Sequence, residues 1–211
     1  MRTRKVLAMA CAAALLALGA AEVASATRLS FNSQRMWWRW NRDFKLRFES
    51  SFITTECNVT MRVELYSAVI VKRVGTRVGQ ISEMTREGCD AGTDVEPWNI
   101  TLPWVLEYEG YSGTLPRPTG LFATAPRIRL TVYNEAVEQR CEYYSTVEDP
   151  WRFILHFSSQ IVNSVDSEEI PTLTLDFNVF WGWLCSPTMK VTGFGTVPTT
   201  DSGTAIRVTL I

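Results

Sequence analysis

Apolar and polar residues alternate strictly over several long stretches of this chain, and this alternation limits its fold more than any other feature. Successive side chains of a strand point to opposite faces of a sheet, so a period of two predicts strands with one buried face. Residues 57–65, 128–132, 172–185 and 206–210 all follow this pattern, and Gly/Pro-containing turns such as 113–120 separate such stretches. The sequence therefore predicts an all-β fold, an antiparallel β-sandwich or partly closed β-barrel.

A helix competes with a strand over residues 149–162. Asp149 could cap a helix and Pro150 could occupy its first position. The apolar residues from Trp151 to Phe157 nevertheless alternate, so we predict a strand there. No internal repeat, low-complexity tract or linker divides the chain, and we expect a single domain over residues 27–211.

The cysteines predict a fold stapled by disulfides. Cys11 lies in the N-terminal segment described next, which leaves Cys57, Cys89, Cys141 and Cys185. Four cysteines in an exported domain indicate two disulfides, with three connectivities open. Short loops close at the lower entropic cost, so we predict Cys57–Cys89 and Cys141–Cys185, each adding roughly 3.5–4 kcal/mol in the chain-entropy model. Their spacings match no zinc pattern.

The first 26 residues have the three parts of a secretory signal peptide. Three bases among residues 2–5 are followed by an apolar run over 6–21 and by Ala24-Ser25-Ala26, the small-x-small pattern of a cleavage site. The run is shorter than the roughly 20 residues that span a bilayer. We expect cleavage after Ala26, no transmembrane segment in the mature chain, and a secreted, extracellular or cell-envelope-associated protein. An uncleaved membrane anchor is the alternative.

A basic, tryptophan-rich segment lies near the start of the mature chain. Residues 35–40 and 44–48 flank Asn41-Arg42-Asp43, a loop of suitable length for a hairpin. Pairing Trp40 with Phe44 would give one face a continuous apolar stripe. That stripe would comprise Met36, Trp38, Trp40, Phe44, Leu46 and Phe48.

The opposite face of this predicted hairpin supplies the candidate binding residues Trp37, Arg39, Lys45 and Arg47. Arg and Lys attract anions and Trp offers a stacking surface, so the face would contact an anionic cell-envelope polymer or lipid headgroups. The alternative is an ordinary solvated face on which Trp37 lies under the stem of Arg47. Without residues 1–26 the chain has 18 Lys and Arg against 21 Asp and Glu, which argues against a nucleic-acid partner.

Signatures of catalysis are weak. His156 is the only histidine, and no nucleophile elbow, zinc-protease helix or phosphate-binding loop occurs. Glu107 and Glu109 could act as paired carboxylates on a glycoside, and the acids of segment 90–96 could hold calcium. We expect no catalytic residue, metal or cofactor, and a secreted, non-catalytic binding or structural module. A cell-wall glycan hydrolase using Glu107 and Glu109 is the alternative.

Several short motifs follow one another in the middle of the chain. They are Cys57-Asn-Val-Thr60, Gly79-Gln-Ile81, Gly88-Cys-Asp-Ala-Gly92, Leu102-Pro-Trp104 and Tyr108-Glu-Gly-Tyr-Ser-Gly-Thr-Leu-Pro116, with Cys141 following. Through these motifs residues 55–145 resemble an uncharacterised family of exported all-β proteins, common in high-GC actinobacteria. The family has no assigned activity, so the resemblance implies export and a β fold and adds nothing on chemistry. The tryptophan-rich segment and Cys185 lie outside it.

Overall fold

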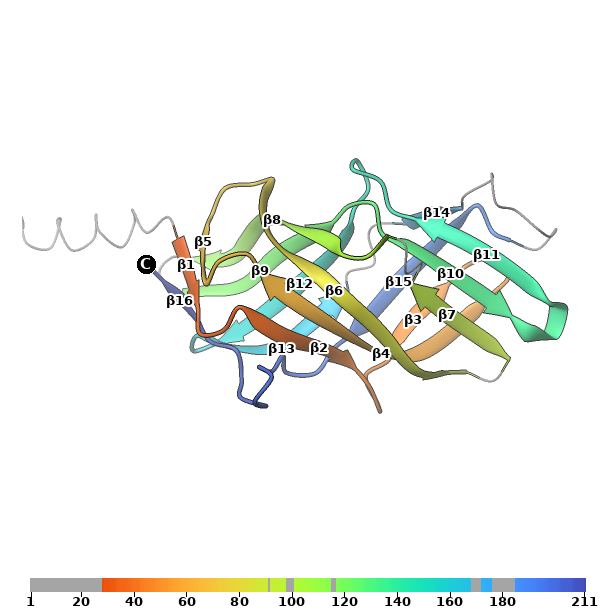
Figure 1. Ribbon diagram of the computed structural model, residues 1–211, viewed down its shortest axis with the longest axis horizontal. Helices are drawn as coiled ribbons and strands as arrows, with labels where there is room; N and C mark the ends of the chain where they lie inside the picture. The colour runs from red at the N-terminus through yellow and green to blue at the C-terminus, as the bar shows by residue number, and fades with distance from the viewer. Residues whose placement is uncertain (1–27, 91, 98–100, 115–116, 168–171, 176–184) are drawn as a thin grey trace, which may run out of the picture.

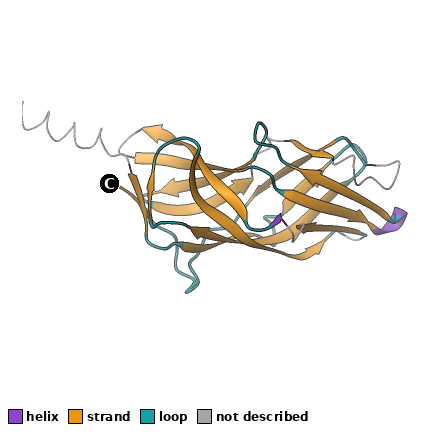
Figure 2. Ribbon diagram, turned by 45° about the horizontal axis from the view of Figure 1, so that its top comes forward, coloured by secondary structure: helices purple, strands orange, loops and turns teal. Residues whose placement is uncertain are grey.

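The structure is a computed structural model that describes residues 28–211, apart from 91, 98–100, 115–116, 168–171 and 176–184. The described residues fold mainly into antiparallel strands, with a short 3₁₀ helix η2 (Glu135–Val137) (Figure 2). The strands are β1 (Arg28–Phe31), β2 (Arg35–Trp40), β3 (Leu46–Glu49), β4 (Thr54–Leu65), β5 (Val69–Val71), β6 (Thr76–Cys89), β7 (Thr93–Pro97), β8 (Trp104–Thr114), β9 (Arg117–Ala125), β10 (Arg129–Asn134), β11 (Gln139–Tyr144), β12 (Trp151–Ser158), β13 (Ile161–Ser167), β14 (Thr172–Leu175), β15 (Thr188–Phe194) and β16 (Val208–Leu210).

The fold is all-β, as the alternation predicts, and the ambiguous stretch from Trp151 is a strand, β12. The predicted signal peptide lies outside the described residues. Of the predicted strand over 172–185, the structure describes only the beginning, as β14, and Cys185 itself. Within the described part of the chain, no helix has the length and apolar character needed to cross a membrane.

Most strands belong to one large sheet that closes on itself. Eight strands pair in the order β13-β12-β9-β8-β6-β4-β3-β15, and the end of β13 pairs again with the end of β15, where Asp166 lies opposite Phe194. From β15 the sheet also continues through β14, β11 and β10 to β7, while β2 pairs with β4. The molecule is therefore elongated, and β15 contributes to both of its halves (Figure 1).

A second sheet of three strands, in the order β16-β1-β5, lies at the end of the molecule near the C-terminus (Figure 1). We call it the cap sheet. Backbone hydrogen bonds join the cap strands and the segments next to them to the large sheet, among them Val208 N to Gln160 O at 2.8 Å and Gly75 N to Tyr108 O at 2.9 Å. The turn between β10 and β11 lies at the opposite end (Figure 1).

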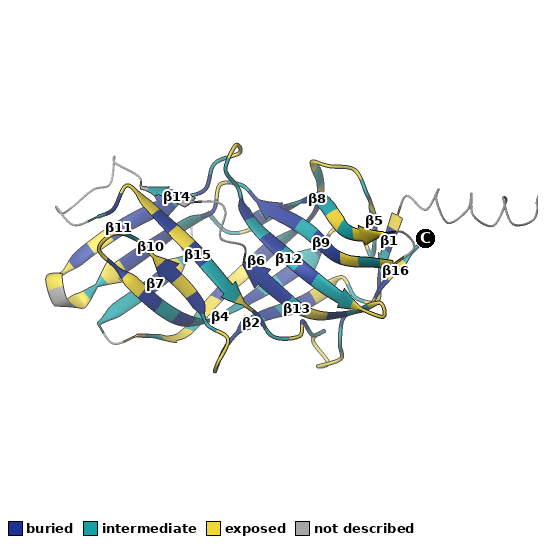
Figure 3. Ribbon diagram, turned by 180° about the vertical axis from the view of Figure 1, so that it is seen from behind, coloured by how far each residue is buried: buried dark blue, intermediate teal, exposed yellow. Residues whose placement is uncertain are grey.

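The alternating residues form the core, as predicted. Along β4, Cys57, Val59, Met61 and Val63 are at most 1% exposed, and the burial colours alternate along the neighbouring strands (Figure 3). In the half next to the cap sheet the core contains a cluster of aromatic rings. The ring of Phe153 lies 5.1 Å from those of Trp38 and Trp151 and 6.3 Å from that of Trp40.

The predicted hairpin between β2 and β3 is wrong. Both strands pair antiparallel with β4, with Trp40 opposite Val59 and Leu46 opposite Cys57, so β3 continues in the direction of β2. The loop contains a tight turn, with Arg42 at φ 58° and a hydrogen bond from Phe44 N to Asn41 O at 3.0 Å. That turn displaces the chain from β4 without reversing it. The 12 residues of β4 offer ladder partners to both segments, which a hairpin would not provide.

The predicted burial of the apolar residues of this segment is confirmed, with one exception. Met36, Trp38, Trp40, Leu46 and Phe48 are at most 2% exposed, because both segments keep their alternation in phase with β4. Phe44, which we expected in the apolar stripe, is 50% exposed because it belongs to the loop between the strands.

Two disulfides link the predicted pairs Cys57–Cys89 and Cys141–Cys185. Cys57 and Cys89 lie directly opposite each other in the β4–β6 ladder. Cys141 belongs to β11, and its bond ties that strand to the segment that leads into β15. The fold class and its disulfides therefore agree with the sequence-based prediction.

Candidate functional site

The four predicted binding residues lie on the outward side of β2 and β3 and of the loop between them. Trp37 and Arg39 lie on β2, Lys45 ends the loop and Arg47 lies on β3. Because β2 and β3 follow one another along β4, these residues form a line and not the compact hairpin face that we expected.

Trp37 is held by residues of its own chain. The guanidinium carbons of Arg39 and Arg62 each lie 5.6 Å from the centre of its ring, and its Nε1 donates a hydrogen bond to Asp201 Oδ1 at 2.9 Å. Arg62 is the cross-strand neighbour of Trp37, the position that the predicted hairpin gave to Arg47. Arg39 Nη1 also donates to Thr199 Oγ1 at 2.7 Å. The Trp37 ring and the guanidinium groups of Arg39 and Arg62 therefore already interact with groups of their own chain.

The other two predicted bases are paired with acids. Lys45 Nζ lies 3.4 Å from Asp90 Oδ1, and Arg47 Nε lies 3.1 Å from Glu49 Oε2. Exposed pairs of this kind are weak, so an external anion could compete for either base. The local charge that they add is nevertheless largely neutralised by the chain itself.

A stronger concentration of positive charge lies at the end that carries the cap sheet. We define the capped end as residues 28–31, 66–77, 111–114, 117–118, 157–161 and 207–211. These segments contain six bases and no aspartate or glutamate. The bases are Arg28, Lys72, Arg73, Arg77, Arg117 and Arg207.

Five of these six bases have no ion-pair partner among the described residues. The exception is Arg77, whose Nε lies 3.9 Å from Glu107 Oε1. All six belong to the surface: Lys72 is partly buried and the others are exposed. Partial burial lowers the pKa of Lys72 from its ordinary value, and its ammonium lies 5.4 Å from the centre of the Tyr111 ring.

The opposite end of the molecule has the reverse charge. We define the far end as residues 86–90, 92–97 and 133–142, which comprise the end of β6, β7 and the β10–β11 turn. These segments hold seven acids, Glu87, Asp90, Asp94, Glu96, Glu135, Glu138 and Glu142, against two bases, Arg86 and Arg140. The elongated molecule is therefore positive at one end and negative at the other.

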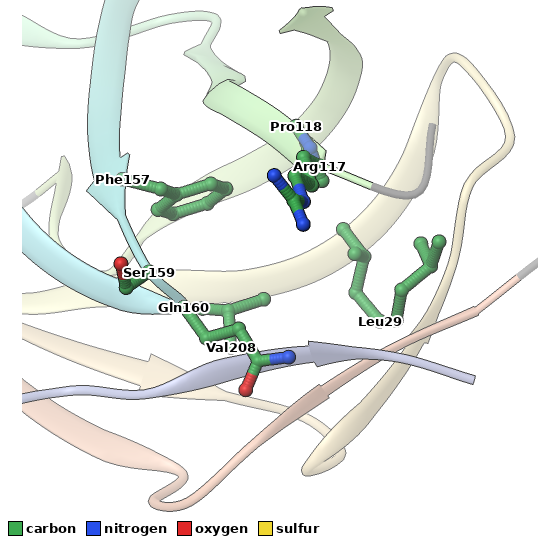
Figure 4. A pocket seen from close by; sticks show the side chains of 8 residues that line it. Leu29, Arg117, Pro118, Phe157, Ser159, Gln160 and Val208 are labelled. Atoms are coloured by element: carbon green, nitrogen blue, oxygen red, sulfur yellow. The ribbon is translucent and has the colours of Figure 1, made fainter. Parts of the chain in front are cut away.

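A cavity of about 460 Å³ opens at the capped end, between the cap sheet and the ends of β9 and β12. Its lining combines apolar with polar side chains: Leu29, Pro118, Phe157, Val208 and Leu210 with Arg117, Ser159 and Gln160. Figure 4 shows the Arg117 guanidinium and the Phe157 ring directed into the same space, with Leu29 and Val208 across from them. Volume and composition are those of a small-ligand site.

The residues considered for catalysis are engaged in pairs. Arg152 donates hydrogen bonds to both oxygens of Glu109, one of them from Nε to Oε2 at 2.6 Å, and Glu107 faces Arg77. His156 Nε2 lies 2.7 Å from Asp166 Oδ2. Burial raises the pKa of Asp166, and the charge and hydrogen bond of His156 oppose that rise.

The acidic segment considered for calcium is bound to bases as well. Asp94 and Glu96 both contact Arg86, the latter at 2.8 Å, while Asp90 faces Lys45. Across the described residues, no group of three or more His, Cys, Asp or Glu side chains is arranged to hold a metal ion.

The chain matches no family model, no curated protein and no solved structure. The geometry of its surface is therefore the basis for the function proposed below.

Proposed function

We propose that this protein is a non-catalytic binding module that acts outside the cytoplasm and contacts an anionic component of the cell envelope through its capped end. The observation that carries this proposal is the set of six bases at that end, five without an ion-pair partner among the described residues. Bases gathered at one end of a molecule raise the local concentration of anions and speed their association.

The separation of charge also favours one orientation. The acids of the far end would be repelled by an anionic surface, so the molecule would present its capped end to such a partner. Two disulfides agree with an oxidising compartment, and residues 1–26 have the sequence pattern of an export signal.

Trp37, Arg39, Lys45 and Arg47 provide the matched comparison for this proposal. They include three bases, but Lys45 and Arg47 face acids while Arg39 interacts with Trp37 and Thr199. An anion would have to displace these contacts. At the capped end it would meet bases that remain open to solvent, so we place the main contact there.

The test compares two triple variants that each remove three positive charges. Lys72→Gln, Arg73→Gln and Arg117→Gln neutralise the capped end, while Arg39→Gln, Lys45→Gln and Arg47→Gln neutralise the predicted face. Binding of the purified protein to immobilised polyglycerol phosphate is measured from low to physiological salt, after mass spectrometry has located its N-terminus.

We expect the capped-end variant to lose at least about 10-fold in affinity and much of its salt dependence, and the second variant to change less than about 3-fold. A larger loss in the second variant would move the contact to β2 and β3. Absence of binding by the unmodified protein, or equal small losses in both variants, would refute the proposal.

A further inference from the structure

The cavity at the capped end has two chemically different parts. Its inner walls are apolar: Leu29 and Val208 of the cap sheet are almost fully covered, at 2% and 5% exposed, so the partly buried Phe157 of β12 supplies more of the accessible apolar wall. Pro118 and Leu210 extend this apolar surface. Such walls accept a hydrocarbon chain, because removing its surface from water is favourable.

The mouth of the cavity is polar and positive. Arg117, Ser159 and Gln160 are exposed there, and no acidic side chain is among the described residues that line the cavity. A guanidinium can donate two parallel hydrogen bonds to a carboxylate or phosphate, so Arg117 is suited to an anionic headgroup. Figure 4 shows its guanidinium directed into the space between Phe157 and Leu29, where it would meet the charged end of an inserted chain.

A backbone turn and a backbone hydrogen bond connect the two sides of the cavity. Ser158 pairs with Ile161, so Ser159 and Gln160 form a two-residue turn, and both have positive φ, 50° and 70°. The bond from Val208 N to Gln160 O then fastens this turn to the cap sheet. A preformed site avoids part of the ordering cost of binding.

We propose that this cavity binds a single-chain anionic amphiphile, with the aliphatic chain between the cap sheet and β12 and the headgroup at Arg117. The inference rests on the proposed function and makes it more specific: the anionic partner of the capped end would include a lipid with one acyl chain. A free fatty acid and a lysophospholipid share this chemistry, and the experiment separates them.

Binding is measured by isothermal titration below the critical micelle concentration, with probes that share a 12-carbon chain. Laurate and lauroyl lysophosphatidylglycerol carry anionic headgroups, whereas dodecyltrimethylammonium carries the opposite charge. We expect the anionic probes to bind at least about 10-fold more tightly than the cation. Preference between the two anions identifies the source of the ligand.

Three variants locate the bound chain. Leu210→Trp places a larger side chain on the partly buried wall and should weaken both anionic probes at least about 10-fold, while binding of polyglycerol phosphate stays within about 2-fold. Arg117→Gln removes the headgroup contact without altering the walls and should weaken the anionic probes about 10-fold. Arg73→Gln, a matched loss of charge at the capped end but outside the cavity lining, should change them less than about 3-fold.

The outcomes separate this inference from the proposed function. Binding of polyglycerol phosphate without binding of either anionic probe would overturn the cavity proposal and leave the proposed function intact. Equal losses in Arg117→Gln and Arg73→Gln would place the amphiphile on the general surface and also overturn it. If Leu210→Trp fails to fold, the comparison of Arg117→Gln with Arg73→Gln still tests the cavity proposal. Both substitutions replace exposed side chains and should not affect folding.

Discussion

The two halves of this molecule are stabilised by different means. Next to the cap sheet, a cluster of large aromatic rings fills the core around Phe153. Towards the far end the buried residues combine Val95, Leu130 and Val132 with Phe48 and Tyr143, and both disulfides belong to strands that reach this half. Covalent links thus add to apolar packing in this half, whereas no disulfide lies among the described residues next to the cap sheet.

Charge divides the molecule in the same way. The half with the aromatic core ends in six bases and a cavity, and the half with the disulfides ends in an excess of acids. The proposed binding end therefore depends on packing for its stability and not on disulfides. A substitution that destabilises one half should therefore leave the other half recognisably folded.

The largest effect should follow loss of the central aromatic ring. Phe153→Ala would leave a cavity between Trp38, Trp40 and Trp151, and we expect the free energy of unfolding to fall by about 4 kcal/mol, measured by urea denaturation with tryptophan fluorescence. Phe44→Ala is the control, since Phe44 is half exposed, and should change stability by less than about 0.5 kcal/mol. A loss below about 1 kcal/mol for Phe153→Ala would contradict the importance of this cluster.

Removing the Cys141–Cys185 disulfide of the far half should lower the free energy of unfolding somewhat less. We expect Cys141→Ala with Cys185→Ala to reduce the free energy of unfolding by about 3 kcal/mol, because the bond closes a long loop in the unfolded chain. Amide hydrogen exchange should show the loss of protection concentrated in β10 and β11, with β12 and β13 largely unaffected. Uniform loss across all strands would show that the two halves unfold as one unit.

The sequence predicts which face of each strand is buried, but not which strands are neighbours. Alternation places Trp38 and Trp40 inward whatever their partner, so those residues were assigned correctly. Whether β2 pairs with β3 or β4 depends on whether the loop at Arg42 reverses the chain, and a three-residue polar loop permits either outcome. The disulfide pairing was predictable because loop-closure entropy, though a weak preference, favoured the short loops.

The capped end left only a short local signal in the sequence, the three bases of segment 72–77. Its other bases, Arg28, Arg117 and Arg207, lie far apart in the chain, and none of them belongs to a charged run of the kind that drew attention to residues 35–47. The fold gathers them because β1, β5 and β16 form one sheet beside the ends of β9 and β12. Charge patterns along the chain thus identified the segment whose bases pair internally and missed those without an acidic partner.

A smaller, stabilising effect is expected at the β12–β13 turn of the capped end. Ser159 and Gln160 both have positive φ, which suits Asn-Gly far better than Ser-Gln. Ser159→Asn with Gln160→Gly should therefore raise the free energy of unfolding by about 0.5–1 kcal/mol, measured by thermal denaturation. The single control Ser202→Asn, in a separate surface loop, should have no such effect. Destabilisation by the double change would mean that Gln160 contributes more through its side chain than it costs in backbone strain.

The last effect concerns the point where the two halves meet, and it is confined to acidic pH. Asp166 lies opposite Phe194 of β15, beside His156, and its burial raises its pKa above the ordinary value of 3.8. The folded state then holds a proton that the unfolded state has already released. The stability that this proton supplies is complete below pH 3.8 and is lost as the pH rises through the raised pKa.

Asp166→Asn should abolish this dependence, so that urea denaturation between about pH 3.5 and 6 shows a shallower decline than in the unmodified protein. His156→Ala removes the partner that lowers the pKa of Asp166, so the carboxyl should titrate at a still higher pH by carbon-detected NMR. A titration midpoint at or below the ordinary aspartate value would show that the ion pair with His156 outweighs burial. In that case stability would instead increase with pH over the same range, and the seam between the halves would be held by charge.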